Sequence, residues 1–203
     1  RSLIGYWSFE HTNSSGVFDN STYENFVSFN GNNFGTDNLT DCEYGRGIKF
    51  DGDDDYLSIS HDENLNSALG SSNTFTISAW IEPDAWVDYG SIGKSSGDCW
   101  SQTTNGLWTY SSGFRCVMGD SNSSQCNDAG SYIFTDSYQP SLNEWYHVAC
   151  VGDGTNLTMY VNGDVKDSIY ISGITETRLN NSNPLIIGKR TPSGGGSLSG
   201  KVD

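Results

Sequence analysis

The amino-acid sequence predicts an all-β fold, and three observations support this class. The segment from Trp145 to Ser172 reads as three strands joined by turns at residues 153–155 and at Asn162-Gly163. Asn-Gly between apolar runs is the strongest short signal for a β-hairpin, because a type I′ turn needs positive φ at both central residues. Side chains between the turns alternate apolar and polar with the period of two that a half-buried strand requires. A composition of 24 Gly, 13% aromatic and 17% charged residues also favours strands and turns over helices.

Further strands are predicted in order from apolar or alternating segments. Residues 75–81 show the clearest alternation, and Pro83 should end that strand because proline cannot donate to a β-ladder. The acidic run at 51–55 predicts the turn of a hairpin. A single helical turn is expected at 140–144. The expected strands and hairpins span residues 3–10, 26–29, 47–50, 56–60, 75–81, 106–119, 132–134, 145–151, 157–162, 165–171, 184–190 and 201–203.

Length and charge limit the function classes. The chain has 203 residues without an internal repeat or linker, which suits one domain over residues 1–203. Ten basic and 25 acidic residues give a formal net charge of −15, which argues against binding to nucleic acid or an anionic membrane surface. No apolar run approaches the roughly 20 residues of a membrane-spanning helix, so no membrane insertion is predicted. Because the chain begins at Arg1, we expect a mature form or an excised domain.

Cysteines and glycosylation acceptors predict an extracellular or cell-surface protein. Four cysteines lie in polar, loop-like contexts, and two disulfides among them have three possible connectivities. The short loop favours Cys116–Cys126, which leaves Cys42–Cys99, while Cys150 lies mid-strand and is expected to be a buried free thiol. Acceptor triplets N-x-[ST] stand at Asn13, Asn20, Asn38, Asn122, Asn156 and Asn180.

Six blocks of the sequence carry a family resemblance. They read GIKFDGDDDYL (47–57), FTISAWI (75–81), NEWYHVA (143–149), LTMYVNG (157–163), PLIIG (184–188) and GKVD (200–203). In this order they resemble the LamG-like (laminin G-like) domains of the concanavalin A-like lectin/glucanase superfamily. The resemblance covers nearly the whole chain and implies a jelly-roll sandwich of two antiparallel sheets.

The same resemblance raises a question about the last strand. The family continues past the aspartate at position 203 with one more strand, which this chain does not contain. We therefore expect that the last strand is absent or is borrowed from elsewhere. An open sheet edge is a template for another chain, so self-association through that edge is a further expectation.

The resemblance also implies a structural calcium ion that ties the first loop to the terminal strand. A hard cation takes about 6–8 oxygen ligands. Residues 19–25 are similar to the family's acidic loop, although Thr22 and Tyr23 depart from it, and Asp203 occupies the terminal carboxylate position. The candidate ligands are Glu10, Asp19, Asn25 and Asp203. The alternative is that Asp19 and Asn25 cap turns. The acidic run at 51–55 lacks the spacing and distal Glu of an EF-hand loop, so we interpret it as a turn.

The sequence favours a protein that is not an enzyme. Retaining glycosidases of the superfamily carry an E-x-D-x-x-E run on one strand, and here every Glu is isolated from such a pattern. A pair of distant carboxylates could still act together, but nothing in the sequence selects one. The three His residues have no companion Ser or Cys in a recognisable context.

Aromatic residues in irregular segments suggest carbohydrate binding instead. Sugar recognition uses flat aromatic faces beside hydrogen-bonding side chains on loops over a rigid sandwich. Trp7, Trp80 and Trp145 lie in predicted strands, so core packing is expected for them. The irregular segment 84–105 is the candidate loop, with the alternative that its Trp side chains fill the ends of the sandwich. Its candidate binding residues are Trp86, Asp88, Tyr89, Trp100, Gln102 and Asn105.

Together these features predict an extracellular, non-catalytic recognition module. It would bind glycans or glycoproteins in a lectin-like manner and be stabilised by Ca²⁺. The alternative is a structural, self-associating subunit of a glycosylated surface filament, coat or adhesin. Fold-level analogy alone does not separate the two, because one fold serves many functions.

Overall fold

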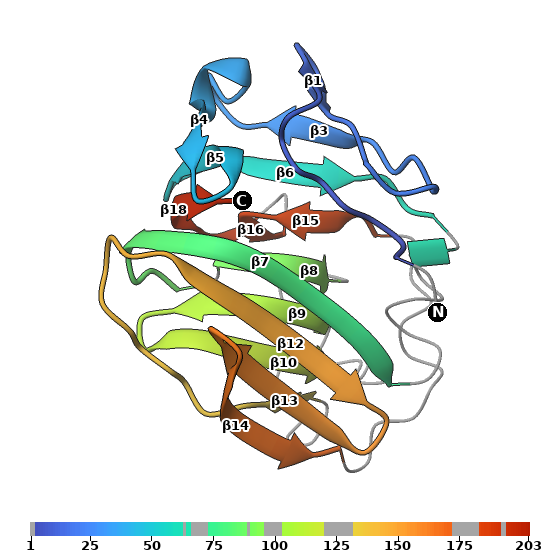
Figure 1. The fold of residues 1–203 in the computed structure, drawn as a ribbon, viewed down its shortest axis with the longest axis vertical. Coiled ribbons are helices and arrows are strands. Elements are labelled where there is room, and N and C mark those ends of the chain that lie inside the picture. The colour runs from blue at the N-terminus through green and yellow to red at the C-terminus, as the bar shows by residue number, and fades with distance from the viewer. Residues whose placement is uncertain are drawn as a thin grey trace.

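A computed structural model describes residues 3–62, 64–65, 73–88, 90–95, 103–119, 132–171, 183–191 and 194–203. The described residues form strands, a short 3₁₀ helix, η1 (Thr36–Asn38), and an α-helical stretch at residues 64–65 (Figure 1). The strands are β1 (Thr12–Asn13), β2 (Gly16–Val17), β3 (Val27–Asn30), β4 (Leu39–Cys42), β5 (Gly45–Asp51), β6 (Tyr56–Ile59), β7 (Thr74–Ala85), β8 (Gly90–Ser95), β9 (Thr103–Tyr110), β10 (Gly113–Gly119), β11 (Tyr132–Phe134), β12 (Tyr146–Asp153), β13 (Asn156–Val161), β14 (Asp164–Tyr170), β15 (Leu185–Ile187), β16 (Lys189–Thr191), β17 (Gly194–Ser197) and β18 (Ser199–Val202).

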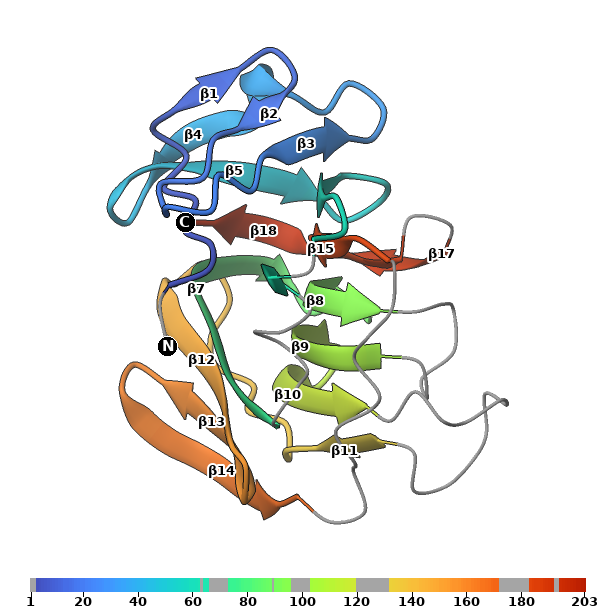
Figure 2. The ribbon, with the colours of Figure 1, turned by 90° about the vertical axis from the view of Figure 1, so that its right-hand side faces the viewer.

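Two large antiparallel sheets form the layers of a sandwich. Within the described residues, sheet A has the order β1-β2-β3-β6-β15-β8-β9-β10-β11, and sheet B has the order β14-β13-β12-β7-β18-β5-β4. Figure 2 shows β12, β13 and β14 of sheet B as one layer and β8 to β11 of sheet A as the other. Strands far apart in the sequence are neighbours, since β18 lies between β5 and β7. The predicted all-β jelly-roll sandwich of two antiparallel sheets is confirmed.

The predicted meander is the edge of sheet B. Strand β12 pairs with β13, and β13 pairs with β14. The turn between β13 and β14 has Asn162 at φ 52° and Gly163 at φ 84°, the positive values that a type I′ turn needs. The helical turn expected at 140–144 is not a helix: a turn lies at residues 142–144, and Asn143 has φ 59°.

The core lies between the inner faces of the two sheets. Alternate residues of each strand point inward, as the period of two requires. Phe50 and Met159 from sheet B meet Leu57 and Phe114 from sheet A in a continuous buried cluster. Most of the hydrophobic free energy comes from this layer, at about 25 cal/mol for each Å² of apolar surface buried.

A disulfide crosses the sandwich and corrects the predicted pairing. Cys116 of β10 is bonded to Cys150 of β12, with a Cα–Cα distance of 5.4 Å. Both residues point inward from opposite sheets, so they face each other although 34 positions separate them. The predictions of Cys116–Cys126, of Cys42–Cys99 and of a free Cys150 are therefore wrong, and Cys42 is free. Cys99 and Cys126 lie outside the described residues.

Two further expectations about strands are wrong. Strand β7 does not end at Pro83 but continues to Ala85. Its pairing with β18 shifts register beside Pro83, so the strand needs no backbone N–H donor at that position. Residues 3–8 belong to no strand. Their backbone is bound by side chains instead: the Tyr6 N–H donates to Asp19, and the Ile4 carbonyl accepts from Asn25.

Candidate functional site

In the predicted carbohydrate-binding segment, residues 84–105, the candidate side chains that the structure describes contact other parts of the protein. Trp86 packs edge-on against Phe114, with 5.0 Å between ring centroids. Asp88 accepts a hydrogen bond from the Ser111 N–H and so stabilises the β9–β10 turn. Asn105 lies in β9 and is 0% exposed. The other three predicted residues, Tyr89, Trp100 and Gln102, lie outside the described residues, so carbohydrate binding by this segment stays a prediction.

Asp19 of the predicted calcium set organises the N-terminal loop. Its Oδ1 accepts from the N–H groups of Tyr6 and Ser21, and its Oδ2 accepts from the Ser21 hydroxyl and the Asn25 N–H. Burial raises the pKa of Asp19, but these hydrogen bonds outweigh it and hold the pKa below 3.8. Both carboxylate oxygens already have two protein donors, and the Asn25 Nδ2 donates to the Ile4 carbonyl. A calcium ion on Asp19 would have to replace hydrogen bonds of the loop, and the calcium site stays a prediction.

Glu10 and Asp203 of the same set lie at the β4–β5 turn. Glu10 Oε1 accepts from the Arg46 N–H at 2.7 Å, and Asp203 Oδ2 accepts from the Tyr44 N–H at 2.7 Å. Burial raises the pKa of Asp203; the Tyr44 hydrogen bond opposes this rise, and the Glu10 charge adds to it. Glu10, Asp19 and Asp203 do not bring three ligand oxygens within 4.8 Å of one another in the described part of the chain.

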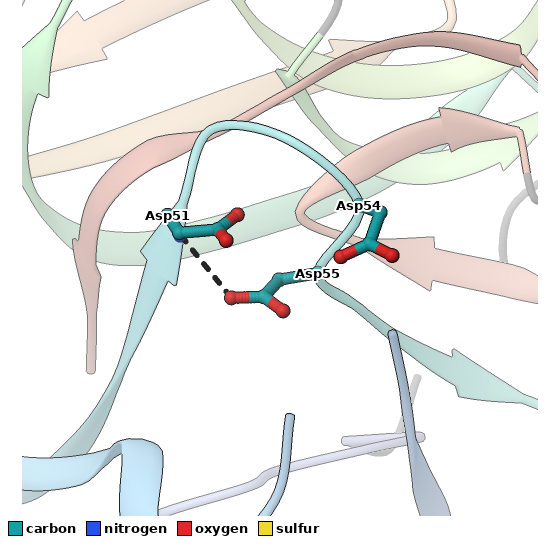
Figure 3. Close-up of side chains that lie close together, drawn as sticks. All are labelled: Asp51, Asp54 and Asp55. Atoms are coloured by element: carbon teal, nitrogen blue, oxygen red, sulfur yellow. Dashed lines mark hydrogen bonds between the residues drawn. The ribbon is translucent and has the colours of Figure 1, made fainter. Parts of the chain in front are cut away.

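Among the described residues, a group of three carboxylates lies close together in the β5–β6 turn. One oxygen from each of Asp51, Asp54 and Asp55 falls within a 4.8 Å group (Figure 3). Asp55 is 2% exposed, and its Oδ2 accepts from the Asp51 N–H. Burial, reinforced by the charge of Asp51, raises the pKa of Asp55 from 3.8 to about 6. The hydrogen bond agrees with the interpretation of this run as a turn. The expectation of a hairpin is wrong, because β5 belongs to sheet B and β6 to sheet A, so the turn crosses between the sheets.

Four of the predicted glycosylation acceptors lie in the described residues. Asn13 and Asn20 are exposed, whereas Asn38 and Asn156 are partly buried. The Asn13 and Asn20 side chains accept hydrogen bonds from nearby backbone or Ser groups. Asn122 and Asn180 lie outside the described residues. Glycosylation at all six positions stays a prediction.

A row of three aromatic rings crosses the outer face of sheet B. The Tyr44 and Trp80 ring centroids are 5.1 Å apart, and those of Trp80 and His147 are 5.3 Å apart. Trp80 of β7 and His147 of β12 are directly opposite in the ladder, so their side chains share a face. Tyr44 is 66% exposed at the β4–β5 turn. We call Tyr44, Trp80 and His147 the aromatic row.

The local structure explains how the row is held. Trp80 faces outward because Ile77, Ala79 and Ile81 alternate with it on the inner face. The backbone of Asp203 pairs with that of Trp80, and its carboxylate binds the Tyr44 N–H, so one residue connects both rings. The turn also needs Gly45, which has φ 97°, because a Cβ there would collide with the Glu10 carboxylate. Core packing was expected for Trp80, and this expectation is wrong, although the alternation of residues 75–81 already signalled its outer position.

The aromatic row borders a cavity of about 1260 Å³. The lining includes the polar residues Thr76, Ser78 and Asp203, together with Tyr6 and Tyr23. Flat aromatic faces next to hydrogen-bonding groups are what sugar binding requires. A second aromatic group, Tyr110 and Phe134 on sheet A, suits sugars less well, because the Arg115 guanidinium lies 4.9 Å from each ring centroid and covers their faces.

Comparison with known families identifies the class of the chain. The model of the Laminin_G_3 family, described as the concanavalin A-like lectin/glucanases superfamily, matches residues 51–203. The match covers most of the chain, and the chain therefore belongs to this family, as the sequence blocks predicted. A comparison with curated proteins finds no match.

Solved structures show the same fold at low sequence identity. Domain 4 of AbnA, an extracellular GH43 arabinanase from Geobacillus stearothermophilus in complex with arabinotriose, has a TM-score of 0.70 and 14% identity, with 100% of this chain and 89% of that one covered. The binding domain of Paraclostridial Mosquitocidal Protein 1 has a TM-score of 0.65 and 16% identity, covering 98% and 48%. The ligand-binding domain of botulinum neurotoxin serotype D, in complex with N-acetylneuraminic acid, has a TM-score of 0.60 and 16% identity, covering 87% and 42%.

The two toxin structures are binding domains, and the arabinanase domain and the botulinum domain are each seen with a carbohydrate. This chain spans less than half the length of the two toxin chains. No helix in the described part of the chain is long and apolar enough to span a membrane.

Proposed function

We propose that this protein is an extracellular, non-catalytic module that binds a neutral oligosaccharide on its aromatic row. The observation that carries the proposal is the row itself: Tyr44, Trp80 and His147 stand in line on a rigid sheet, beside polar groups. A rigid platform loses little conformational entropy when a sugar stacks on it. The carbohydrate complexes of two structural neighbours support the same class of ligand. The Cys116–Cys150 disulfide supports an oxidising, extracellular location.

Charge favours a neutral sugar over an anionic one. The chain carries a formal net charge of −15, and Asp203 and Glu10 lie near the row. A sialic acid carboxylate would meet this negative field, whereas an arabinose or hexose chain would not. Between the two ligands of the neighbours, the proposal therefore prefers arabinotriose over N-acetylneuraminic acid.

Calcium is not part of this proposal. The predicted ligand Asp19 has all its hydrogen-bonding capacity in use within the N-terminal loop. The aromatic row and its polar neighbours need no metal ion to present their faces, so the binding of sugar should be insensitive to chelators.

Calorimetry and a glycan array with a matched variant test the proposal. We expect arabinotriose or another neutral oligosaccharide to bind, and the double variant Tyr44→Ala, Trp80→Ala to lose about tenfold or more in affinity, since each stacked ring contributes roughly 1 kcal/mol. Tyr170→Ala is the control, because this ring is 65% exposed on β14 at the far edge of the same sheet. Equal affinity in the double variant, or binding of N-acetylneuraminic acid alone, would refute the proposal.

A further inference from the structure

An arginine side chain lies between two aromatic rings on the outer face of sheet A. Its strand, β10, is placed between β9 and β11 (Figure 2). Phe114 and Cys116 of β10 are fully buried in the core, so Arg115 between them points outward. The guanidinium carbon lies 4.9 Å from the ring centroid of Tyr110 on β9 and 4.9 Å from that of Phe134 on β11. Both neighbouring strands therefore hold this side chain in place.

The guanidinium is further oriented by a hydrogen bond. Its Nε donates to the Ser137 hydroxyl, and the Ser137 and Ser112 hydroxyls lie 2.8 Å apart and share a hydrogen bond. Arg115 is partly exposed, so its Nη groups can be reached from solvent. The two rings and the Ser137 hydroxyl thus present a guanidinium whose position is fixed before any ligand arrives.

Arg115 differs from the described lysines in having no acidic partner. Lys49, Lys166 and Lys201 each lie 2.7 to 3.5 Å from a carboxylate oxygen. Across the ranges that the structure describes, no carboxylate forms an ion pair with Arg115, although the sequence holds 25 acidic residues against ten basic ones. The Nη donors of Arg115 are therefore left for water or for a ligand.

The chemistry of this group selects a carboxylate. A planar guanidinium binds a carboxylate through two parallel hydrogen bonds, which a lysine ammonium cannot reproduce. Because the rings already restrict the side chain, little rotamer freedom is lost when the ligand binds. The guanidinium covers the ring faces, so a ligand meets its N–H groups rather than the flat faces of Tyr110 and Phe134.

We propose that Arg115 binds the carboxylate of an acidic sugar, a hexuronate residue of a glycan. Two observations favour a sugar over a peptide. Strand β10 pairs with β9 on one side and with β11 on the other, so a peptide cannot add to its backbone. The Ser112 and Ser137 hydroxyls lie next to the guanidinium, where they can bond to the hydroxyl groups of the same sugar ring.

The ligand should carry a single negative charge. The chain has a formal net charge of −15, and just after β11 the Asp136 N–H donates to the Asp167 carboxylate. Charges more than about 8 Å away are largely screened at physiological ionic strength, so Arg115 dominates at short range. Each further negative charge on the ligand would add repulsion, which favours a uronate over a sulfated or phosphorylated chain. The aromatic row lies on sheet B, so this inference does not depend on the proposed function.

An NMR titration of the full chain tests the inference. The probe is methyl β-D-glucuronoside, and the matched ligand is methyl β-D-glucoside, in which a CH₂OH group replaces the carboxylate. We expect the glucuronoside to shift the Nε–Hε signal of Arg115 and to bind at least about tenfold more tightly than the glucoside, because hydrogen bonds between charged groups are the stronger ones. The variant Arg115→Lys keeps the charge but not the planar fork, and should lose at least about tenfold in affinity.

Two further variants separate binding from folding. Lys166→Gln is the control, because Lys166 also lies over a ring, 4.8 Å from the centroid of Tyr138, but is already paired with Asp164. This variant should bind the glucuronoside as the parent protein does. Ser137→Ala removes the hydrogen bond to Nε and leaves the guanidinium in place, so it should weaken binding by less than Arg115→Lys does.

Several outcomes would overturn the inference. One is equal affinity for the glucoside, and another is unchanged affinity in Arg115→Lys. Loss of glucuronoside binding in the double variant Tyr44→Ala, Trp80→Ala, with Arg115→Lys unaffected, would place the sugar on the aromatic row instead. If N-acetyl-L-glutamate N-methylamide bound as tightly as the glucuronoside, the ligand would be a carboxylate of any origin and the assignment to an acidic sugar would be wrong.

Discussion

Removing the Cys116–Cys150 disulfide should weaken the sandwich strongly. The bond joins β10 of sheet A to β12 of sheet B across 34 positions. In the chain-entropy model, a loop of this length constrains the unfolded state by about 12–13 cal/mol/K, or roughly 4 kcal/mol at 25 °C. For a chain of this size, that loss lowers Tm by about 8–15 °C. We therefore expect the double variant Cys116→Ala, Cys150→Ala to unfold at clearly lower urea concentration than the parent protein.

Urea and thermal unfolding measure the loss, with Cys42→Ala as the control. Burial, increased by the Asp203 charge, raises the pKa of Cys42 to about 11, so it stays a protonated thiol that forms no bond in the described structure. The control should change stability by less than about 1 kcal/mol. Peptide mapping by mass spectrometry must find Cys116 linked to Cys150. A Cys116–Cys126 fragment, or a double variant as stable as the control, would show the reasoning to be wrong.

Two further predictions concern the acidic groups. The pKa of Asp55 rises from 3.8 to about 6 in the folded state, so the protonated carboxyl favours folding. This contribution to the free energy of unfolding is fully present below about pH 4 and is lost as the pH rises through 6, a loss of at most about 3 kcal/mol. The variant Asp55→Asn should remove this pH dependence. Urea unfolding between pH 4 and 7.5 checks this, and a variant with the same slope as the parent protein would contradict it. Because hydrogen bonds saturate Asp19, we expect Tm to differ by less than about 1 °C between excess CaCl₂ and EDTA. A larger rise that Asp19→Asn abolishes would restore the predicted calcium site, and a rise abolished only by Asp55→Asn would place the ion at the β5–β6 turn.

Local signals in the sequence were sufficient for part of the fold. The meander follows from alternation and from Asn162-Gly163, because strand period and turn type are properties of a few neighbouring residues. The position of β18 between β5 and β7 follows from no local pattern, because it depends on which distant strands meet in the folded chain. Residues 3–8 show why pattern alone can mislead: they alternate like a strand, but Asp19 takes the backbone donor of Tyr6.

The candidate site was harder to predict for the same reason. The disulfide was assigned by closeness in sequence, whereas the face and sheet of each cysteine decide which two can meet. No pattern in the sequence indicated that Tyr44 belongs to the site. Its place beside Trp80 depends on a hydrogen bond from its N–H to Asp203, at the far end of the chain. Trp80 could have been found, because its outer position follows from the period of two along β7.

Asp203 holds two members of the aromatic row from the far end of the chain. Its backbone exchanges two hydrogen bonds with that of Trp80, and its carboxylate accepts from the Tyr44 N–H. A substitution at Asp203 would therefore disturb Tyr44 and Trp80 together and could not separate a lost contact with sugar from a displaced ring. For this reason the control for the row was taken from the far edge of sheet B at Tyr170, which has no such connection to the row.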